Sequence, residues 1–370
     1  MSMAHQHDSE HPHKHTHHHH GDECDHEHGH EHHHHGDECD HEHGHEHAEH
    51  SHIDPAQMRV RRIAARLVVA MALLLTASWF IAPETAHYAT LIFLGIVMEA
   101  APWILAAAVL TLGMEAVLRD DWLPRIARRT GWFGLPLVAL ASPFIPTCEC
   151  GVVVVLRGLL RKGLPLPHAI VFLLVAPILN PLVLLSTWVA FANWEMALWR
   201  GGLGFVVAVL VGTIFWRMNP ATALVRGNDC GGHQHHHAGG WGGRAERVLG
   251  DVFDTFLFFL FGVGLATALR VAIPASSLDG IAGDPAIAPM ITMALAFVSS
   301  LCSEADAFIA AGMHGFALSA LLAFLVFGPM CDIKLLLMLR TVLTPMAIAK
   351  IMGTTAVLVY LGSLITGIWI

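Results

Sequence analysis

Charged residues are scarce in this sequence. Asp, Glu, Lys and Arg make up 14% of its 370 residues, whereas hydrophobic residues make up 54%. A water-soluble domain carries about 25% charged residues, so the composition excludes a soluble globular protein. Several apolar runs reach the length of about 20 residues that a helix needs to cross a bilayer. The composition therefore predicts an all-α polytopic membrane protein in contact with the lipid bilayer.

The absence of several sequence motifs reduces the number of possible functional classes. The sequence contains no Walker-type Gly-Lys-Ser or Gly-Lys-Thr motif and no P-type phosphorylation motif, so ATP use by this chain is unsupported. Its seven cysteines lack the spacing of a small disulfide-linked secreted domain. The first residues are acidic and polar, unlike a secretory leader, and we expect insertion to start at the first internal apolar helix. We therefore expect a transporter rather than an enzyme, without a resident cofactor or a nucleic-acid partner.

The N-terminal tail, residues 1–58, has the opposite composition. Residues 1–52 hold 22 of the 29 His residues and 13 acidic residues against one Lys, whereas the rest of the chain carries 20 basic against 17 acidic residues. The sequence HHHHGDECDHEHGHE at 17–31 is repeated identically at 32–46. Because so few apolar residues cannot bury a core, we expect the tail to be disordered.

The tail is rich in ligands for transition metals, since imidazole and thiolate suit ions such as Zn and Cu. The tail residues expected to bind metal are His17, His18, His19, His20, Cys24, His26, His28, His32, His33, His34, His35, Cys39, His41 and His43. A second candidate cluster, in the Gly-rich loop 217–247, consists of Cys230, His233, His235, His236 and His237. Whether transport requires either segment is left open by the sequence.

Basic residues define the topology of the two membrane halves, 59–216 and 248–370. Arg residues precede the first apolar helix, which places the N-terminus in the cytoplasm by the positive-inside rule. By the same rule, the loop 217–247 and the residues Lys334 and Arg340 are cytoplasmic. We expect about seven full spans, at 64–82, 88–118, 168–191, 198–216, 252–272, 315–338 and 345–368.

Two further apolar segments, 132–160 and 287–312, are interrupted. If 132–160 crossed the bilayer once, the basic residues after it would lie outside the cell, against the rule. The conflict disappears if the segment is a re-entrant hairpin of two half-helices, each too short to span, whose irregular backbone lines a cavity. The tip of the first hairpin is then 148–150 (Cys-Glu-Cys), and that of the second is 302–306 (Cys-Ser-Glu-Ala-Asp).

The two hairpins are related by an internal repeat. Cys150 precedes a Pro by 27 residues, and Cys302 precedes another Pro by the same interval. At the same offset Asn180 matches Asp332. Without the first span, 64–82, each half has three full spans and one hairpin, which gives the halves opposite orientations in the bilayer. The spacing therefore predicts the inverted repeat of secondary transporters, in which broken helices meet near the midplane.

Thiols and carboxylates inside apolar segments define a candidate ion pathway, because ionisable residues at membrane depth are costly and usually functional. Thiolate favours soft or borderline metals such as Cu(I) and Zn(II), and a mixed set of Cys, Glu and Asp is compatible with Zn(II) and less so with Mg(II). Glu99 and Asp254 occupy matching apolar helices, and are candidate proton carriers, partners of an Arg or caps of a broken helix. The candidate pathway residues are Cys148, Glu149, Cys150, Asn180, Cys302, Glu304, Asp306, Cys331, Asp332, Glu99 and Asp254.

Three runs of sequence resemble a known family. They are CECGVVVVLRGLLRKGLPLPHAIVFLLVAPILNP, SSLCSEADAFIAAGM and LAFLVFGPMCDIK. The sequence from about residue 88 to 368 resembles the predicted-permease family, which includes organoarsenical permeases and candidate Cu/Zn efflux transporters. The resemblance implies a bacterial cytoplasmic-membrane permease that exports a toxic inorganic or thiol-reactive solute. The residues that match the family's motifs are Cys148, Cys150, Asn180, Pro181, Cys302, Glu304, Asp306, Pro329 and Asp332.

Two departures from the family's pattern leave the substrate open. Glu149 stands where a small residue is usual, and Val154-Val155 stands where a proline is common. We predict a secondary transporter that exports soft or borderline transition-metal ions, with proton exchange as the coupling. The alternatives are a permease for organoarsenicals or another thiol-reactive solute, a membrane metal sensor or buffer, and a membrane thiol oxidoreductase that cycles Cys148 and Cys150. In that last case the disulfide would close a strained ring.

Overall fold

A computed structural model gives the structure of this chain. It describes residues 55–81, 83–118, 122–145, 147–225, 241–272, 284, 286–313 and 315–369. The chain divides into two units, 1–51 and 52–370, and every described residue belongs to the second. The predicted metal ligands of the tail and of the 230–237 cluster lie outside the described residues, so metal binding there stays a prediction.

All regular elements among the described residues are helices, apart from one isolated antiparallel bridge between Leu224 and Leu343. The α-helices are α1 (Pro55–Ile81), α2 (Pro83–Val117), α3 (Trp122–Thr130), α4 (Gly134–Ala141), α5 (Glu149–Arg161), α6 (Leu166–Val175), α7 (Pro181–Phe191), α8 (Trp194–Ile214), α9 (Pro220–Ala223), α10 (Trp241–Ala272), α11 (Ile287–Ser299), α12 (Ser303–Gly312), α13 (Leu318–Met330), α14 (Ile333–Leu339) and α15 (Pro345–Thr366). Short 3-10 turns occupy Gly131–Phe133, Ser142–Phe144 and Phe215–Arg217. The predicted helical class is confirmed for this part of the chain.

Five of the described helical segments are long and apolar enough to cross a membrane. They are Pro83–Val117, Trp194–Arg217, Gly242–Leu269, Leu318–Leu339 and Pro345–Thr366. Large apolar side chains on α2, such as Leu105 and Val109, are exposed, as expected of a surface that faces lipid. The chain is therefore a polytopic membrane protein.

Two of the seven expected spans are not among these five segments. The expected span 64–82 lies within α1, and the expected span 168–191 is divided between α6 and α7. The chain between those two short helices turns at 176–180. The count of seven full spans therefore stays a prediction.

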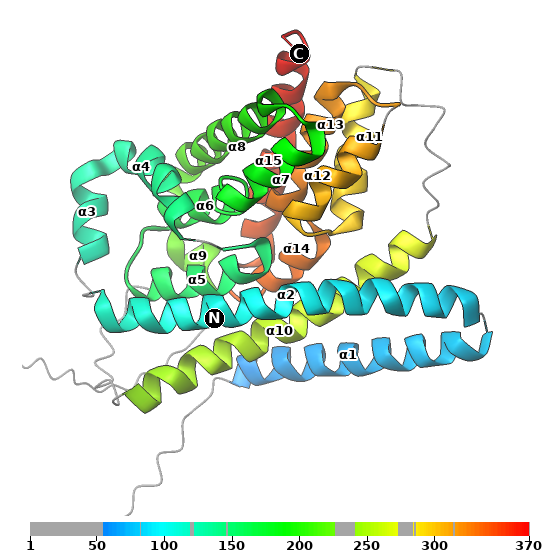
Figure 1. Ribbon diagram of the computed structural model, residues 1–370. Coiled ribbons are helices and arrows are strands. Elements are labelled where there is room, and N and C mark those ends of the chain that lie inside the picture. The colour runs from blue at the N-terminus through cyan, green and yellow to red at the C-terminus, as the bar shows by residue number, and fades with distance from the viewer. Residues whose placement is uncertain are drawn as a thin grey trace, which may run out of the picture. The chain divides into compact units, whose positions relative to one another are not determined.

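The three long helices α1, α2 and α10 pack against one another in a layer along one side of the described unit (Figure 1). The start of α5 packs on α2, and α14 packs on α10. Gly151 permits the first of these approaches, because a Cβ atom there would lie 2.9 Å from the Cβ atom of Ala107. The core beyond this layer is formed mainly by α5, α6 and α13, whose side chains are almost entirely buried.

The two halves share one order of helices. Apart from α1, α3 and α9, which have no counterpart, the first half runs α2, α4, α5, α6, α7 and α8, and the second runs α10, α11, α12, α13, α14 and α15. Within the halves α4 packs on α6 as α11 packs on α13, and across them α7 packs on α12 and α5 on α14. The chain breaks before α5 and before α12, where the sequence placed the two hairpin tips. Their insertion in the bilayer as re-entrant hairpins stays a prediction.

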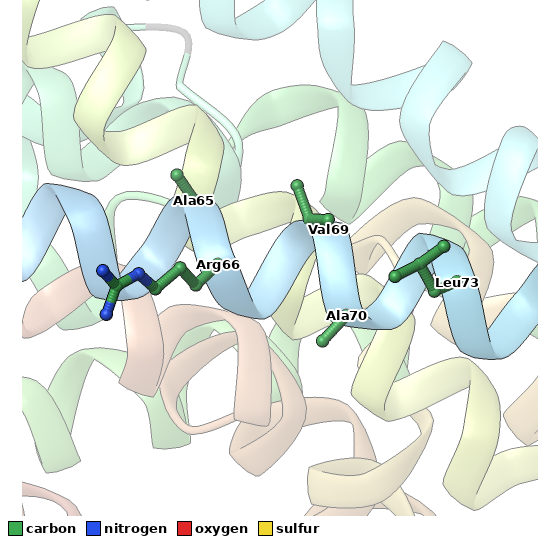
Figure 2. A pocket seen from close by; sticks show the side chains of 5 residues that line it. All are labelled: Ala65, Arg66, Val69, Ala70 and Leu73. Carbon is green, nitrogen blue, oxygen red and sulfur yellow. The ribbon is translucent and has the colours of Figure 1, made fainter.

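A shallow pocket runs along α1 and is lined by Ala65, Arg66, Val69, Ala70 and Leu73 (Figure 2). It offers one charged side chain and neither a thiol nor a carboxylate. The chemistry that the sequence singles out lies instead where the broken helices meet.

Candidate functional site

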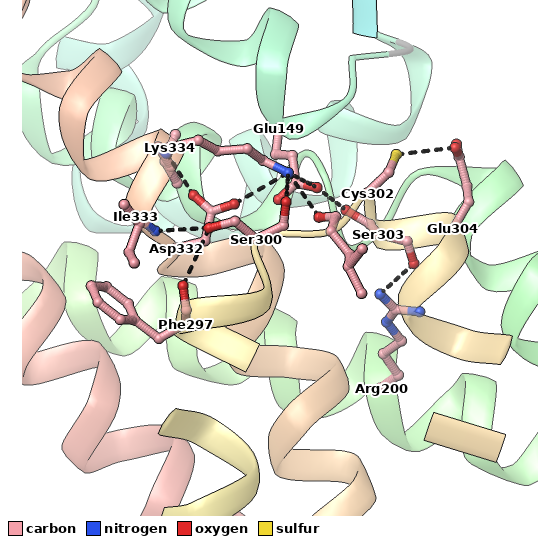
Figure 3. Close-up of polar contacts among 12 residues, drawn as sticks. Glu149, Arg200, Phe297, Ser300, Cys302, Ser303, Glu304, Asp332, Ile333 and Lys334 are labelled. Carbon is pink, nitrogen blue, oxygen red and sulfur yellow. Dashed lines mark hydrogen bonds and ion pairs between the residues drawn. The ribbon is translucent and has the colours of Figure 1, made fainter. Parts of the chain in front are cut away.

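Lys334, the second residue of α14, lies at the centre of the broken helices (Figure 3). Its side chain is only 1% exposed. The ammonium group donates hydrogen bonds to the carbonyl oxygens of Ser300 and Leu301, each at 2.8 Å. It also lies 3.3 Å from Glu149 Oε1 and 3.3 Å from Asp332 Oδ2. We call the groups that carry these four oxygen atoms the lysine cage.

Local sequence builds one side of the lysine cage. Helix α11 ends at Ser299, and Ser300 follows with a φ of 44°, which turns the chain out of the helix. The carbonyl groups at a helix C-terminus lack intrahelical partners and carry partial negative charge, so they favour a cation. The hydroxyl of Ser300 accepts a hydrogen bond of 3.2 Å from the backbone N–H of Ile333. This contact links the end of α11 to the start of α14.

Asp332 has a double role at the start of α14. It is the N-cap, and its Oδ1 accepts a hydrogen bond from the backbone N–H of Leu335. Its other carboxylate oxygen faces Lys334 at 3.3 Å. The cap holds the carboxylate in place, so the same residue begins the helix and supplies negative charge to the cage.

The motif 148–150 supplies the other side of the site. Cys148 is the N-cap residue of α5, and Glu149 and Cys150 are its first two helical residues. All three side chains are buried. The two thiols are hydrogen-bonded to each other and form no disulfide with any described cysteine. Ser303, at the start of α12, donates a hydrogen bond of 3.4 Å to Glu149 Oε1. The two predicted hairpin tips are therefore in direct contact.

Three groups near the start of α12 form a separate candidate metal site. Ligand atoms of Glu99, Cys302 and Glu304 all lie within 4.8 Å of one another. The Cys302 thiol donates a hydrogen bond of 3.4 Å to Glu304 Oε2. Glu304 Oε1 is buried and has no hydrogen-bond partner among the described residues, while Glu99 is exposed on α2. One sulfur and two carboxylate donors are a ligand set that suits Zn(II).

Arg200 is a second buried cation at the site, on helix α8. It donates hydrogen bonds to Thr187 Oγ1 at 2.7 Å and to the carbonyl oxygen of Ser303 at 3.0 Å (Figure 3). Among the carboxylates, the charge of Asp306 acts on it most strongly. Asp306 packs against α13, where a Cβ atom at Gly328 would lie 3.0 Å from its Oδ2.

Carboxyl groups outnumber basic groups at the site. Five carboxylates face two basic groups, Lys334 and Arg200, when all are ionised. The carboxylates are Glu99, Glu149, Glu304, Asp306 and Asp332. Burying this excess is costly unless a cation or protons balance it. The arrangement therefore suits the binding of a positively charged solute.

Three residues of the predicted pathway take other positions. Asn180 caps α7 by accepting a hydrogen bond of 3.0 Å from the N–H of Leu182, and its amide lies 3.5 Å from the carbonyl oxygen of Thr147. Asn180 therefore connects the start of α7 to the irregular segment that precedes the Cys-Glu-Cys motif. Cys331 is hydrogen-bonded to Thr355 of α15. Asp254 acts electrostatically on Arg157, which favours the predicted alternative of an Arg partner.

Sequence reasoning missed the two basic residues of the site. Lys334 was assigned to the cytoplasmic end of a span, whereas the structure buries it among the broken helices. Arg200 is absent from the predicted pathway residues, and the structure buries it on α8. A basic residue within an apolar helix is itself a signal of such a site, since its charge must be balanced by acidic or polar groups inside the protein.

A second ion-pair network joins the two halves. Arg157 of α5 contacts Asp251 Oδ1 of α10 at 2.8 Å and donates to the carbonyl oxygen of Thr341 at 3.1 Å. Arg161 pairs with Asp251 Oδ2 and lies 2.8 Å from Glu115 Oε1 of α2. The network connects α2, α5 and α10 with the chain that follows α14.

The part of the chain that forms this site is similar to known proteins. The model of a family described as "Predicted permease" matches residues 85–368. The UPF0718 protein YcgR of Bacillus subtilis (strain 168) is 36% identical over 280 residues, which cover 74% of this chain and 95% of that protein. A protein of Streptococcus mutans serotype c (strain ATCC 700610 / UA159), named as a candidate two-component membrane permease complex subunit, is 31% identical over 292 residues, covering 77% and 97%. No solved structure matches significantly.

Proposed function

Because this chain belongs to the predicted-permease family, we propose that it is a permease that exports soft or borderline transition-metal cations of the Zn and Cu class. The observation that carries the proposal is the buried meeting point of the broken helices, where free thiols lie beside an excess of carboxylates. Thiolate selects soft and borderline metals, and the carboxylates supply the negative charge that a cation needs in apolar surroundings. We place the protein in a bacterial cytoplasmic membrane with a cytoplasmic N-terminus.

The cargo would use two neighbouring sets of ligands. Glu99, Cys302 and Glu304 form the outer set, because Glu99 is exposed and Cys302 is half-buried. Cys148, Glu149 and Cys150 form the inner set and are buried. Ser303 links the two sets, since it follows Cys302 in the chain and its hydroxyl donates to Glu149. A metal ion could thus exchange ligands stepwise without losing all protein contacts.

The shared helix order supports alternating access. If the two halves are inserted with opposite orientations, the breaks before α5 and α12 become two re-entrant tips that meet inside the membrane. Contacts between α7 and α12, and between α5 and α14, place each tip against the other half. Rocking of one half against the other would then expose the ligands to one side at a time. Exchange with protons is the coupling that we propose for this movement.

Flux through proteoliposomes tests the proposal. We would reconstitute the full chain and measure uptake of Zn²⁺ and Cu⁺ by wild type and by variants Cys302→Ser and Cys150→Ser. The matched control is Cys331→Ser, the same change at a buried thiol that contacts α15 instead. Loss of one ligand should lower the apparent affinity for metal by about tenfold or more, because removing even a hydrogen-bond partner of a metal ligand lowers affinity by about that factor. Equal uptake by all three variants would refute the assignment of the thiols.

A permease for organoarsenicals or another thiol-reactive solute is the second candidate. The hydrogen-bonded thiols of Cys148 and Cys150 favour it, because both could bind one thiol-reactive atom. This solute would need no excess of carboxylates. The same liposomes distinguish the two functions: Glu304→Gln should impair metal uptake and leave uptake of a trivalent organoarsenical unchanged, whereas Cys150→Ser should impair both.

A further inference from the structure

We infer that the lysine cage is a binding site for a hard, oxygen-seeking cation, and that Lys334 occupies it as a tethered substitute for that ion. The cage comprises the carbonyl oxygens of Ser300 and Leu301 and the carboxylates of Glu149 and Asp332 (Figure 3). The inference goes beyond the transport of a soft metal, because it concerns a different class of ion and a set of ligands that shares only Glu149 with the inner set.

The geometry resembles ion coordination more than a single salt bridge. An ammonium group has three N–H donors and no acceptor, and here four oxygen donors surround it. The two carbonyl oxygens lie at 2.8 Å, while the nearest carboxylate oxygens remain at 3.3 Å. A buried ion pair optimised for its lysine would have shorter contacts to the carboxylates. The cage therefore has room to contract around a smaller cation.

Unused acceptors in the cage point to the same ion. Glu149 Oε2 is buried and accepts no hydrogen bond from any described residue, and the buried Asp332 Oδ2 has only its contact with Lys334 at 3.3 Å. Both side chains are almost completely buried, so solvent does not compensate these oxygens. A metal ion can take up several carboxylate oxygens at once, whereas an ammonium group has only three directed donors. The spare oxygens are ligands that the lysine does not fully use.

The backbone of the cage is also built for a cation. Ser300 and Leu301 follow the C-terminus of α11, where the chain leaves the helix and both carbonyl oxygens accept hydrogen bonds from the Lys334 ammonium group. Unwound carbonyls at helix breaks bind coupling ions in transporters with broken helices. All four donors are oxygens, which select hard ions such as Na⁺, Mg²⁺ or Ca²⁺ over soft ones. The thiol-containing sets beside the cage have the opposite preference.

Occupancy by Lys334 has a direct consequence. Two cations within a few ångströms repel each other strongly in a medium of low dielectric constant, so the cage holds either the ammonium group or a free ion. With Lys334 in place, its single positive charge already balances one of the two carboxylates, Glu149 or Asp332. Removing the ammonium group should leave a site with two buried carboxylates that captures an ion from solution.

Thermal unfolding of the purified full chain in detergent tests this inference. We would compare wild type with Lys334→Met in NaCl and in choline chloride at constant ionic strength, with MgCl₂ and CaCl₂ as further arms. Wild type should unfold at the same temperature in Na⁺ and in choline. Lys334→Met should have a lower unfolding midpoint in choline. Its midpoint should rise by about 3 °C or more as the concentration of a hard cation is raised from about 1 to 100 mM, because a ligand that binds only the folded state stabilises it.

Two variants control the experiment. The double variant Lys334→Met with Glu149→Gln removes one carboxylate from the cage and should lose most of the cation response. Lys350→Met makes the same change at an exposed lysine of α15 and should behave as wild type. A response in Lys350→Met equal to that of Lys334→Met would identify a general salt effect and overturn the inference.

A further variant covers the case in which Lys334→Met does not fold. In Lys334→Gln the amide can still donate to the two carbonyl oxygens but carries no charge, so its midpoint should also rise with a hard cation. Midpoints of both variants that do not depend on the cation would overturn the inference. The measurement uses no transported metal, so its outcome is independent of the proposed function: metal flux can fail while the cation response holds, and the reverse.

Discussion

Asp251→Asn tests how strongly ion pairs hold the two halves together. The substitution keeps the shape of the side chain and removes its charge. Asp251 is 19% exposed and binds Arg157, which is 6% exposed, and Arg161, which is 30% exposed. Arg157 would then keep the carbonyl oxygen of Thr341 but lose its direct carboxylate partner. A nearly buried guanidinium group would be left with incomplete compensation.

The expected loss of stability lies between two limits. Removal of one partner from a fully buried pair costs about 3–5 kcal/mol, and exposed pairs contribute about 0–1 kcal/mol. Because Arg157 is nearly buried but retains one carbonyl acceptor, we expect Asp251→Asn to cost about 2–3 kcal/mol. Such a loss should lower the unfolding midpoint by about 4–8 °C for a chain of this size.

The matched control is Glu115→Gln, the same change from carboxylate to amide in the same network. Glu115 contacts Arg161, whose side chain is 30% exposed and keeps Asp251. We expect this variant to cost about 1 kcal/mol or less. Intrinsic tryptophan fluorescence of the purified protein in detergent reports both midpoints. Equal midpoints for the two variants, or an unchanged midpoint for Asp251→Asn, would refute the reasoning from burial.

Three further predictions concern packing, capping and the tail. Gly212→Ala places a Cβ atom 2.3 Å from Val171 Cγ2, and this overpacking should destabilise the protein by about 1–3 kcal/mol and lower its unfolding midpoint. The control Gly202→Ala, on the same helix, places its Cβ atom where no described atom lies within 4 Å, so it should raise the midpoint slightly. Asn180→Ala removes an N-cap and should cost about 1 kcal/mol in the same assay, while Asn180→Asp should restore most of it. Deletion of 1–52 should reduce the number of Zn²⁺ ions bound per chain in equilibrium dialysis; an unchanged number would contradict metal binding by the tail.

Much of the local structure followed from the sequence. Hydropathy predicted a helical membrane protein, because the length and apolarity of a segment are properties of that segment alone. The repeat predicted that Asn180 and Asp332 hold equivalent positions, and both are N-caps of short helices after a break. The breaks before α5 and α12 were also expected, since cysteine and acidic residues interrupt the apolar pattern there.

The partners of the charged residues could not be read in the same way. Ser303 meets Glu149, 154 residues earlier in the chain, and Arg157 meets Asp251, 94 residues later. Cys331 lies beside Asp332 in sequence, yet its thiol contacts α15 because successive residues at a helix break point in different directions.

The sequence by itself determined that this chain is a helical membrane protein with two interrupted segments that carry thiols and carboxylates. Only the tertiary structure decided that Lys334 and Arg200 lie among those carboxylates, and that Glu99 joins Cys302 and Glu304. The physical reason is the range of the forces. Hydropathy and capping act within a few residues, whereas a buried charge is balanced by whichever groups the packing of distant helices brings within a few ångströms.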